Sequence, residues 1–222
     1  MKLLSSIKYS LLSLFLIIFT VPLAFSQQQE TAEETGLTPK FGIKVGANLA
    51  NLYVDNVQDE NIKLGLNIGF YGKIPLTRGL SIQPELLFSS KGAKLTYNNV
   101  LQGQGEYRFN LNYVEMPLLL VINLVPNLNL HLGGYTAFLT SSNVKDVNKD
   151  GTVNGVTNLK TDDFNRFDYG LVAGLGVDIQ NMTLGMRYNY GLKEVGKSGS
   201  LSGDVTKNSK NSVFSLYVGF AF

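Results

Sequence analysis

The last nine residues, Phe214-Ser215-Leu216-Tyr217-Val218-Gly219-Phe220-Ala221-Phe222, alternate apolar side chains with small or polar ones up to an aromatic C-terminus. Successive side chains of a β-strand point to opposite faces, so this segment would have one apolar face and one small or polar face. That alternation is typical of a strand in an outer-membrane barrel, where one face meets lipid and the other meets the lumen. The C-terminal segment therefore predicts the fold class and the membrane together.

The N-terminus has the pattern of a cleavable signal peptide. Lys2 and Lys8 precede an apolar stretch over residues 11–21, and Ala24 and Ser26 place small residues at the −3 and −1 positions of a cut after Ser26. A membrane anchor is the alternative, but this stretch is shorter than the ~20 apolar residues of a spanning helix. The chain has no cysteine, which excludes a lipoprotein, a disulfide framework and a thiolate metal site.

Removal of residues 1–26 leaves about 196 residues, which suits one domain. Residues 27–40 carry three glutamates and read as a flexible periplasmic leader, and residues 41–222 form the predicted barrel domain. A net charge of +2 indicates no nucleic-acid partner. We expect the mature protein to sit in the outer membrane, in contact with its lipid.

Eight segments of alternating polarity follow Phe41, each near the 9 to 11 residues that a tilted membrane strand needs. They cover residues 41–49, 64–74, 80–89, 107–124, 128–138, 167–179, 183–192 and 214–222. Short turns at 75–79, 125–127 and 180–181 alternate with long polar connections at 51–63, 92–106, 141–165 and 193–212. The pattern predicts an all-β fold: an eight-stranded antiparallel up-and-down transmembrane β-barrel with short periplasmic turns and long extracellular loops.

The polar face of these segments carries charges that would lie in the lumen. The cations are Lys44, Lys73 and Arg187, and the anions are Glu85, Glu115, Asp168 and Asp178. Buried charges are normally paired, and an eight-stranded barrel is only wide enough for side chains to fill. We therefore expect a salt-bridged plug rather than an aqueous pore.

Two other features of the strands need a physical account. His131 is the sole histidine; with no second histidine or cysteine near it, it is expected to be a hydrogen-bonded lumen residue rather than a proton switch or ligand. Pro84 and Pro117 each remove a ladder hydrogen bond. A bulge at Pro117 would explain why Glu115 and Leu119 share one parity in an otherwise apolar segment.

One predicted loop contains a calcium-like motif. Asp146, Asn148, Asp150 and Asn154 place oxygen ligands at positions 1, 3, 5 and 9 around a glycine at position 6. Position 12 is Thr157 instead of a bidentate glutamate, so any calcium in the loop 146–157 would bind weakly. Asp162 or Asp163 could fold back to supply the missing carboxylate. The alternative is an ordinary polar turn.

The central segments also carry a family resemblance. Ile82-Gln83-Pro84-Glu85-Leu86-Leu87-Phe88, then Lys91-Gly92, then Tyr113-Val114-Glu115-Met116-Pro117-Leu118-Leu119-Leu120 resemble the core of the PorT-like outer-membrane β-barrel family of Bacteroidota. Residues 42–48 are similar to that family's first strand, whereas Val121 replaces a basic residue at the end of the motif. The resemblance implies an outer-membrane barrel and no particular reaction.

Three functions follow as hypotheses. The first is a non-enzymatic integral outer-membrane barrel with a plugged polar lumen and with surface loops that contact an unknown partner. The second is a narrow porin or a component of a secretion or transport system, and the third is a soluble lipocalin-like barrel that binds an apolar ligand. Phe222, which resembles the C-terminal signal recognised by the barrel assembly machinery, argues against the third. No enzyme is expected, because the one histidine lies in mid-strand and no cofactor motif is present beyond the possible calcium loop.

Overall fold

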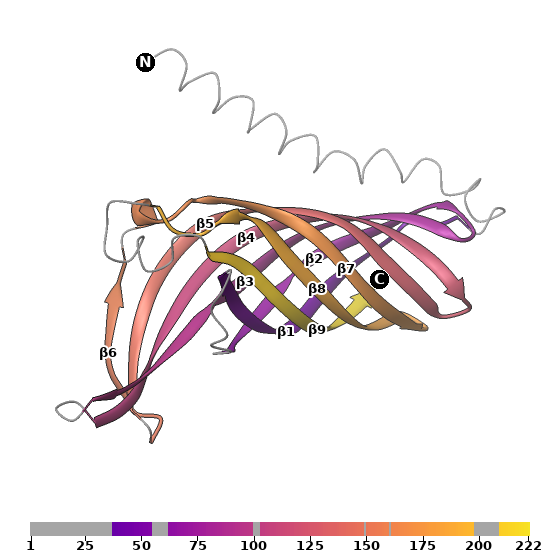
Figure 1. Cartoon of the computed structure of the whole chain (residues 1–222). Coiled ribbons are helices and arrows are strands. Elements are labelled where there is room, and N and C mark those ends of the chain that lie inside the picture. Colours follow the sequence, from indigo (N-terminus) through magenta and orange to yellow (C-terminus); the bar gives the residue numbers. More distant parts are fainter. Residues whose placement is uncertain (1–36, 55–61, 100–102, 149, 160, 198–208) are drawn as a thin grey trace, which may run out of the picture. The chain divides into compact units, whose positions relative to one another are not determined.

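The computed structural model describes residues 37–54, 62–99, 103–148, 150–159, 161–197 and 209–222 (Figure 1). Its strands are β1 Lys40–Val54, β2 Lys63–Thr77, β3 Leu80–Asn99, β4 Gly103–Val125, β5 Leu128–Asn148, β6 Val153–Asn158, β7 Phe167–Ile179, β8 Met182–Glu194 and β9 Ser209–Ala221, with a 3₁₀ turn η2 at Thr161–Asp163. The predicted signal peptide and most of the predicted leader lie outside the described residues. None of the helices in the described part is long and apolar enough to cross a membrane.

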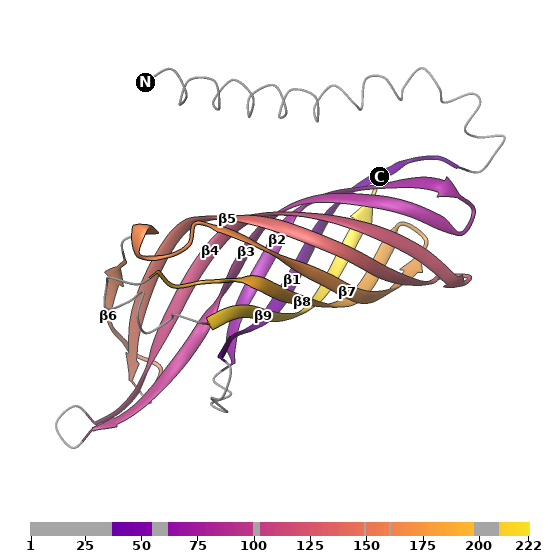
Figure 2. The same cartoon turned by 45° about the horizontal axis from the view of Figure 1, so that its top comes forward.

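Eight strands form a closed antiparallel ring in the order β4-β3-β2-β1-β9-β8-β7-β5, and the pairing of β4 with β5 closes it. The first and last strands meet at a seam that runs from Gly42 opposite Ala221 to Val54 opposite Ser209. Figures 1 and 2 show all eight strands crossing the barrel at a slant. The predicted eight-stranded up-and-down barrel is confirmed, and β6 is an added strand that pairs with β5 outside the ring.

The two faces of the barrel wall differ as the alternation predicted. Outward side chains are apolar and open: Leu64 is 69% exposed, Phe70 63% and Leu118 58%. Inward side chains are polar and buried, with Lys44 and Glu115 each 2% exposed. An apolar outer band around a charged interior suits a bilayer and not water. The lipocalin-like hypothesis, which requires an apolar interior, is therefore wrong.

At one end of the barrel, neighbouring strands are connected by tight two-residue turns. Arg78-Gly79, Pro126-Asn127 and Gln180-Asn181 connect β2 to β3, β4 to β5 and β7 to β8. Asn127 (φ 72°) and Gln180 (φ 55°) lie in the left-handed region, which asparagine visits at little cost. The carbonyl of Asn127 also accepts a 2.7 Å hydrogen bond from the Asp178 amide, which ties the β4–β5 turn to the end of β7.

The opposite end differs from the prediction of long loops. β3, β4 and β5 have 20, 23 and 21 residues, against 13 to 15 for the other ring strands. The predicted loop 92–106 is mostly paired strand, up to Asn99 opposite Gly103, and the predicted loop 141–165 holds the end of β5, then β6 and η2. Outside lipid a strand needs no apolar face, so the periodicity that marks a membrane strand does not detect these extensions. We call residues 92–99, 103–112, 141–148 and 153–158 the external sheet; it projects beyond the ring (Figure 1).

The predicted bulge at Pro117 is also wrong. The β4–β5 register runs unbroken from Tyr113 opposite Leu139 through Pro117 opposite Tyr135, and its two shifts lie elsewhere, between Asn112 and Tyr113 and between Asn123 and Val125. The β3–β4 register is likewise the same on both sides of Pro84. Glu115 and Leu119 face inward by plain alternation, so no extra residue is needed to explain their parity.

Candidate functional site

Eight charged side chains of the lumen form three layers, which together contain all seven predicted lumen charges. The periplasmic layer lies near the short turns and is built on Asp178 of β7. Its carboxylate accepts hydrogen bonds from Lys73 Nζ (2.8 Å), Asn129 Nδ2 (2.9 Å) and Thr183 Oγ1 (2.6 Å). The Lys73 and Asp178 side chains are 20% and 29% exposed, so this layer is partly solvated.

The middle layer is built on Glu85 of β3 and is fully buried. Arg187 of β8 donates from Nη1 at 2.8 Å and from Nη2 at 3.0 Å, which gives a bidentate pair. Lys44 of β1 forms a second ion pair with the same carboxylate, and Gln83 Nε2 donates to it at 2.6 Å. Lys44 Nζ also lies 4.2 Å from the ring centroid of Tyr217. One carboxylate thus joins three strands that are remote in sequence.

His131 connects the periplasmic and middle layers. Its Nδ1 lies 3.3 Å from Arg187 Nη2, and its Nε2 lies 2.6 Å from Asn129 Oδ1. A guanidinium can only donate hydrogen bonds, so Nδ1 accepts from Arg187, and the protonated Nε2 donates to Asn129 Oδ1. The His131 side chain is 2% exposed, and both of its ring nitrogens are engaged in hydrogen bonds with neighbouring lumen side chains.

The outer layer lies toward the external sheet and pairs one cation with two carboxylates. Lys91 Nζ is 2.6 Å from Glu115 Oε2 and 3.8 Å from Asp168 Oδ2. Asn189 Nδ2 donates to Glu115 at 2.8 Å. Asp168 accepts from the Tyr135 hydroxyl at 3.0 Å, and from Asn211 Nδ2 at 2.9 Å.

Lys91 was not among the predicted lumen charges, although it is 0% exposed. The third strand was predicted to end at residue 89 and the next connection to begin at residue 92, so Lys91 was named only as part of the family resemblance. A signal for it exists in the sequence: Gln83, Glu85, Leu87 and Ser89 all face inward, and Lys91 is the next residue of the same parity.

The three layers are electrically balanced, and little space is left between the middle and outer layers. They contain four cations (Lys44, Lys73, Lys91 and Arg187) and four carboxylates (Glu85, Glu115, Asp168 and Asp178). A cavity between the middle and outer layers, lined by Lys44, Glu115, Arg187 and Asn189 among others, has a volume of about 10 Å³. That is about the room of one water molecule.

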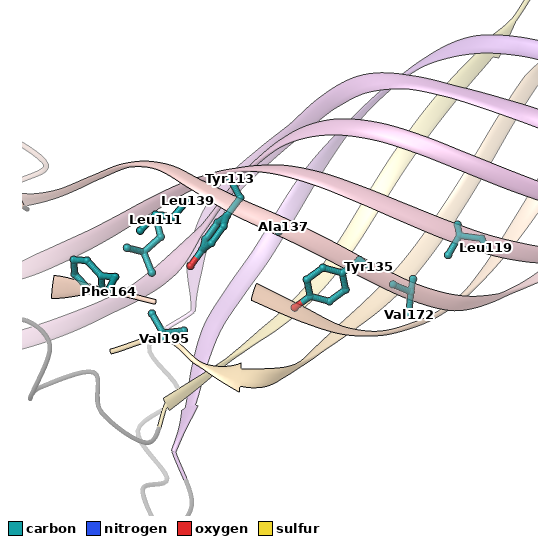
Figure 3. Packing of buried hydrophobic residues seen from close by; sticks show 9 residues of the cluster. All are labelled: Leu111, Tyr113, Leu119, Tyr135, Ala137, Leu139, Phe164, Val172 and Val195. Carbon is teal, nitrogen blue, oxygen red and sulfur yellow. The ribbon is translucent and has the colours of Figure 1, made fainter. Parts of the chain in front are cut away.

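An apolar cluster covers the outer layer from the side of the external sheet. Phe164, which follows η2, is 0% exposed and belongs to a cluster with Leu111, Leu139 and Val195. Figure 3 shows these four side chains at one end of the cluster, with Tyr113 and Tyr135 between them and the deeper Leu119 and Val172. The amide of Asn165 donates to the Val195 carbonyl at 2.8 Å, which fastens the two connecting segments to each other. The charged layers are thereby shielded at this end.

The calcium motif lies at the hairpin between β5 and β6. Asn148 and Asn154 donate to each other's side-chain oxygens at 2.8 and 2.5 Å, and Asp150 Oδ1 accepts from the Thr152 amide at 2.9 Å. That hydrogen bond lowers the pKa of the fully exposed Asp150. Among the described residues, no three acidic or histidine side chains cluster as metal ligands, and Asp146 stands within β5 opposite Gly155. Calcium binding stays a prediction.

Phe222 follows the last residue of β9. Its amide donates to the Phe41 carbonyl at 2.9 Å, and its side chain is 83% exposed at the periplasmic end of the seam. The ring is therefore accessible, as recognition by an assembly factor would require.

Comparison with solved structures finds small outer-membrane barrels. The attachment invasion locus protein Ail of Yersinia pestis, in a complex with the heparin analogue sucrose octasulfate, is 12% identical, with 83% of this chain and 99% of that chain covered and a TM-score of 0.46. Neisserial surface protein A is 13% identical, with 82% and 97% covered and a TM-score of 0.44. The N-terminal barrel of Pseudomonas aeruginosa OprF is 14% identical, with 83% and 100% covered and a TM-score of 0.32.

Comparison with curated protein sequences gives no significant match. Comparison with family profiles gives a match over residues 25–195, to the family described as outer membrane protein beta-barrel domain. The matched segment is more than half of the chain and includes strands β1 to β8 of the barrel. This chain therefore belongs to the outer membrane protein beta-barrel domain family.

Proposed function

We propose that this protein is a non-enzymatic, non-conducting barrel of the outer membrane that acts through its external sheet. The observation that carries the proposal is the filled lumen: four cations and four carboxylates occupy its three layers, and the cavity between two of them measures about 10 Å³. A hydrated ion needs a continuous water path, and these layers leave room for one water at that point.

The external sheet supports the second half of the proposal. Long segments of outer-membrane barrels face the outside of the cell, which supports an extracellular position for the sheet. All six residues of β6 are exposed, and β6 is the terminal strand of the sheet order, so one of its edges has no strand partner in the described structure. A rigid sheet offers a partner a more ordered surface than a loop does.

The family membership indicates that the protein lies in the outer membrane, but it does not indicate what the protein does there. Within the family, the segments 82–88 and 113–120 support a place among the PorT-like members of Bacteroidota. The PorT-like resemblance also supports a second candidate function, a transport-associated outer-membrane component. The filled lumen weighs against solute passage by this chain alone.

Planar-bilayer recording tests the plug. The unmodified protein should give no unitary current steps, whereas Lys91→Ala/Glu115→Ala removes one cation and one anion from the outer layer together and should admit water there. Phe70→Ala, on the outer face, is a matched control that leaves the lumen unchanged. Stable single-channel steps from the unmodified protein would refute the plug and favour the narrow porin.

Cell fractionation tests the location. The mature protein should appear in the outer-membrane fraction and should migrate differently on a denaturing gel before and after boiling, because a closed barrel resists detergent. Recovery in the soluble periplasmic fraction would contradict the proposal.

A further inference from the structure

The outer wall of the barrel contains an apolar groove of about 650 Å³. Its walls are two neighbouring rows of outward side chains that run in register across the strands. The first row extends from Val45 of β1 to Leu128 of β5, and the second from Ala47 of β1 to Leu175 of β7. We call the space between these two rows the wall groove. Figure 1 shows β1, β9, β8 and β7, which carry most of it, side by side along the barrel.

The hollow follows from the sizes of the side chains. On β9 the groove residues Leu216 and Val218 lie between Phe214 and Phe220, whose exposed rings project from the same face of the strand. On β1, Ala47 adds only a methyl group to the second row. Larger side chains thus border the groove on both sides, and the backbone between the two rows forms its floor.

The wall groove faces the hydrocarbon of the membrane. Val45 and Met186, which line it, are exposed, whereas their sequence neighbours Lys44 and Arg187 point into the lumen and are buried. None of the described residues that line the groove is charged. An apolar occupant from the membrane therefore fits this surface, and a polar solute does not.

The groove covers the depth of one membrane leaflet. One end lies at Leu128, the first residue of β5, beside the short turns. The other end lies at Val45, five residues after the start of β1 at Lys40. Five residues span about 17 Å along a strand, which is about 13 Å along the barrel axis at a tilt of about 40°. The apolar band of such barrels is about 25 Å tall, so the groove runs from the interface to the middle of the membrane.

The shape of the groove matches a single extended hydrocarbon chain. Two outward rows of one strand are two residues apart, which is about 6.6 Å. Five strands at a spacing of about 4.8 Å make the groove about 19 Å long. A chain that lies in this channel contacts both rows and the floor, whereas a chain on a convex part of the wall contacts it from one side only.

A second copy of the barrel is the other apolar occupant to consider. A two-fold contact places the same surface patch of both copies against each other. Two hollows that face each other leave their space unfilled, and unfilled space forfeits the packing contacts that would hold a dimer. The concave form of the groove therefore favours a lipid chain.

The end of the groove near Leu128 is bordered by uncharged polar turns. Asn127 directly precedes Leu128, and Gln180 and Asn181 connect β7 to β8; all three are exposed. Their amide side chains can hydrogen-bond to a lipid headgroup, but they carry no charge that would select an anionic one. Recognition is therefore expected to come from the chain and not from the charge of the headgroup.

We propose that the wall groove binds one acyl chain of a phospholipid in the periplasmic leaflet, with the end of the chain at Val45 and the glycerol at Leu128. The choice of leaflet rests on the orientation used above, with the short turns in the periplasm. The groove crosses the pairing of β1 with β9, so the bound chain packs against both terminal strands at once.

Native mass spectrometry of the refolded protein in detergent tests the proposal, with phosphatidylethanolamine as the probe. The groove variant is Ala47→Phe/Val218→Phe, which fills the channel. Its control, Val114→Phe/Ala173→Phe, makes the same two changes at exposed outward positions that do not line the groove. We expect the groove variant to bind the first lipid about tenfold more weakly, and the control to bind it within about threefold of the unmodified protein.

A photoactivatable lipid locates the chain on the unmodified protein and needs no variant to fold. A diazirine near the end of the acyl chain should attach to β1 or β9, close to Val45, and a diazirine near the glycerol should attach close to Leu128. Peptide mapping by mass spectrometry identifies the adducts. Adducts spread evenly around the barrel, or the reverse order of the two positions, would overturn the proposal.

The remaining outcomes also decide. Phosphatidylglycerol, which is anionic, should bind within about threefold of phosphatidylethanolamine; a much tighter anionic lipid would show that the headgroup is recognised instead of the chain. Equal losses in both double variants, or a dimer that only the groove variant abolishes, would likewise refute the acyl-chain site. Planar-bilayer currents do not enter this test, so a failure of the lumen plug leaves the wall groove standing, and the reverse holds as well.

Discussion

Glu85 is the carboxylate that forms ion pairs with two buried cations of the middle layer, Lys44 and Arg187. The substitution Glu85→Gln keeps the size of the side chain and one carbonyl oxygen, but it removes the only carboxylate that pairs with Lys44 and Arg187 in the described structure. Those two cations are 2% and 4% exposed and would remain buried beside each other without an anion. The variant therefore tests charge compensation and little else.

The expected loss is large. Removal of one partner of a buried ion pair costs about 3 to 5 kcal/mol, whereas exposed pairs contribute about 0 to 1 kcal/mol. Asp178→Asn is the matched control, because Asp178 pairs with Lys73 in the partly solvated periplasmic layer, where the side chains are 29% and 20% exposed. We expect Glu85→Gln to lower the free energy of unfolding by about 3 kcal/mol or more, and Asp178→Asn to lower it by about 1 kcal/mol.

Urea unfolding in lipid vesicles measures both values, with the slope of the transition checked for each protein. A third variant, Lys44→Met/Glu85→Met/Arg187→Met, replaces the whole charged triad by apolar side chains and should recover most of the loss, since no charge is left unpaired. The reasoning is refuted if Glu85→Gln unfolds within about 1 kcal/mol of the unmodified protein, or if the triple variant is less stable than the single one.

Gly185→Ala places a methyl group 2.3 Å from Cζ of Tyr217 and should destabilise the barrel by about 1 to 3 kcal/mol in urea unfolding, whereas Gly155→Ala, which meets nothing within 4 Å, should change it little. Deletion of Phe222, whose ring is 83% exposed, should reduce the membrane-inserted yield in cells; an unchanged yield would rule out an assembly role for it. If the β5–β6 hairpin binds calcium, titration calorimetry should give a dissociation constant of about 10⁻⁴ to 10⁻³ M that Asp150→Ala abolishes, and heat that survives this substitution would contradict the site.

The ring could be predicted from the sequence because the membrane imposes a period of two on every strand inside it. Leu64, Leu66 and Phe70 against Gly65 and Asn67 show that period directly, and the strict alternation of short and long connections gave the strand order. The same period did not predict the strand segments that lie beyond the membrane. Lys94, Arg108 and Asn143 satisfy a backbone ladder as well as any apolar residue does, so their strands have no compositional signature.

The charged residues of the candidate site were predictable as a set but not as pairs. Alternation put Glu85, Glu115 and Arg187 on the inner face, but which cation meets which carboxylate depends on the stagger of strands that are remote in sequence. Glu85 and Arg187 are separated by 102 residues, and only closure of the ring brings them together. Lys91 was missed for a different reason, because the strand that carries it was predicted to end at residue 89, two residues before Lys91, whereas it continues to Asn99.

The seam between β1 and β9 has a consequence for the order of assembly. Asn99 and Gly103 begin the β3–β4 hairpin only four positions apart, whereas Gly42 and Ala221 meet at the seam from about 180 positions apart. By the logarithmic dependence of closure entropy on loop length, the seam contact costs about 3 kcal/mol more to initiate than the hairpin. The long hairpin of β3 and β4 should therefore form early and the seam last, so that β1 and β9 remain unpaired edges until the final step. An assembly factor could bind Phe222 at the end of β9 and shield the two unpaired edges. It would then act at the slowest step of folding.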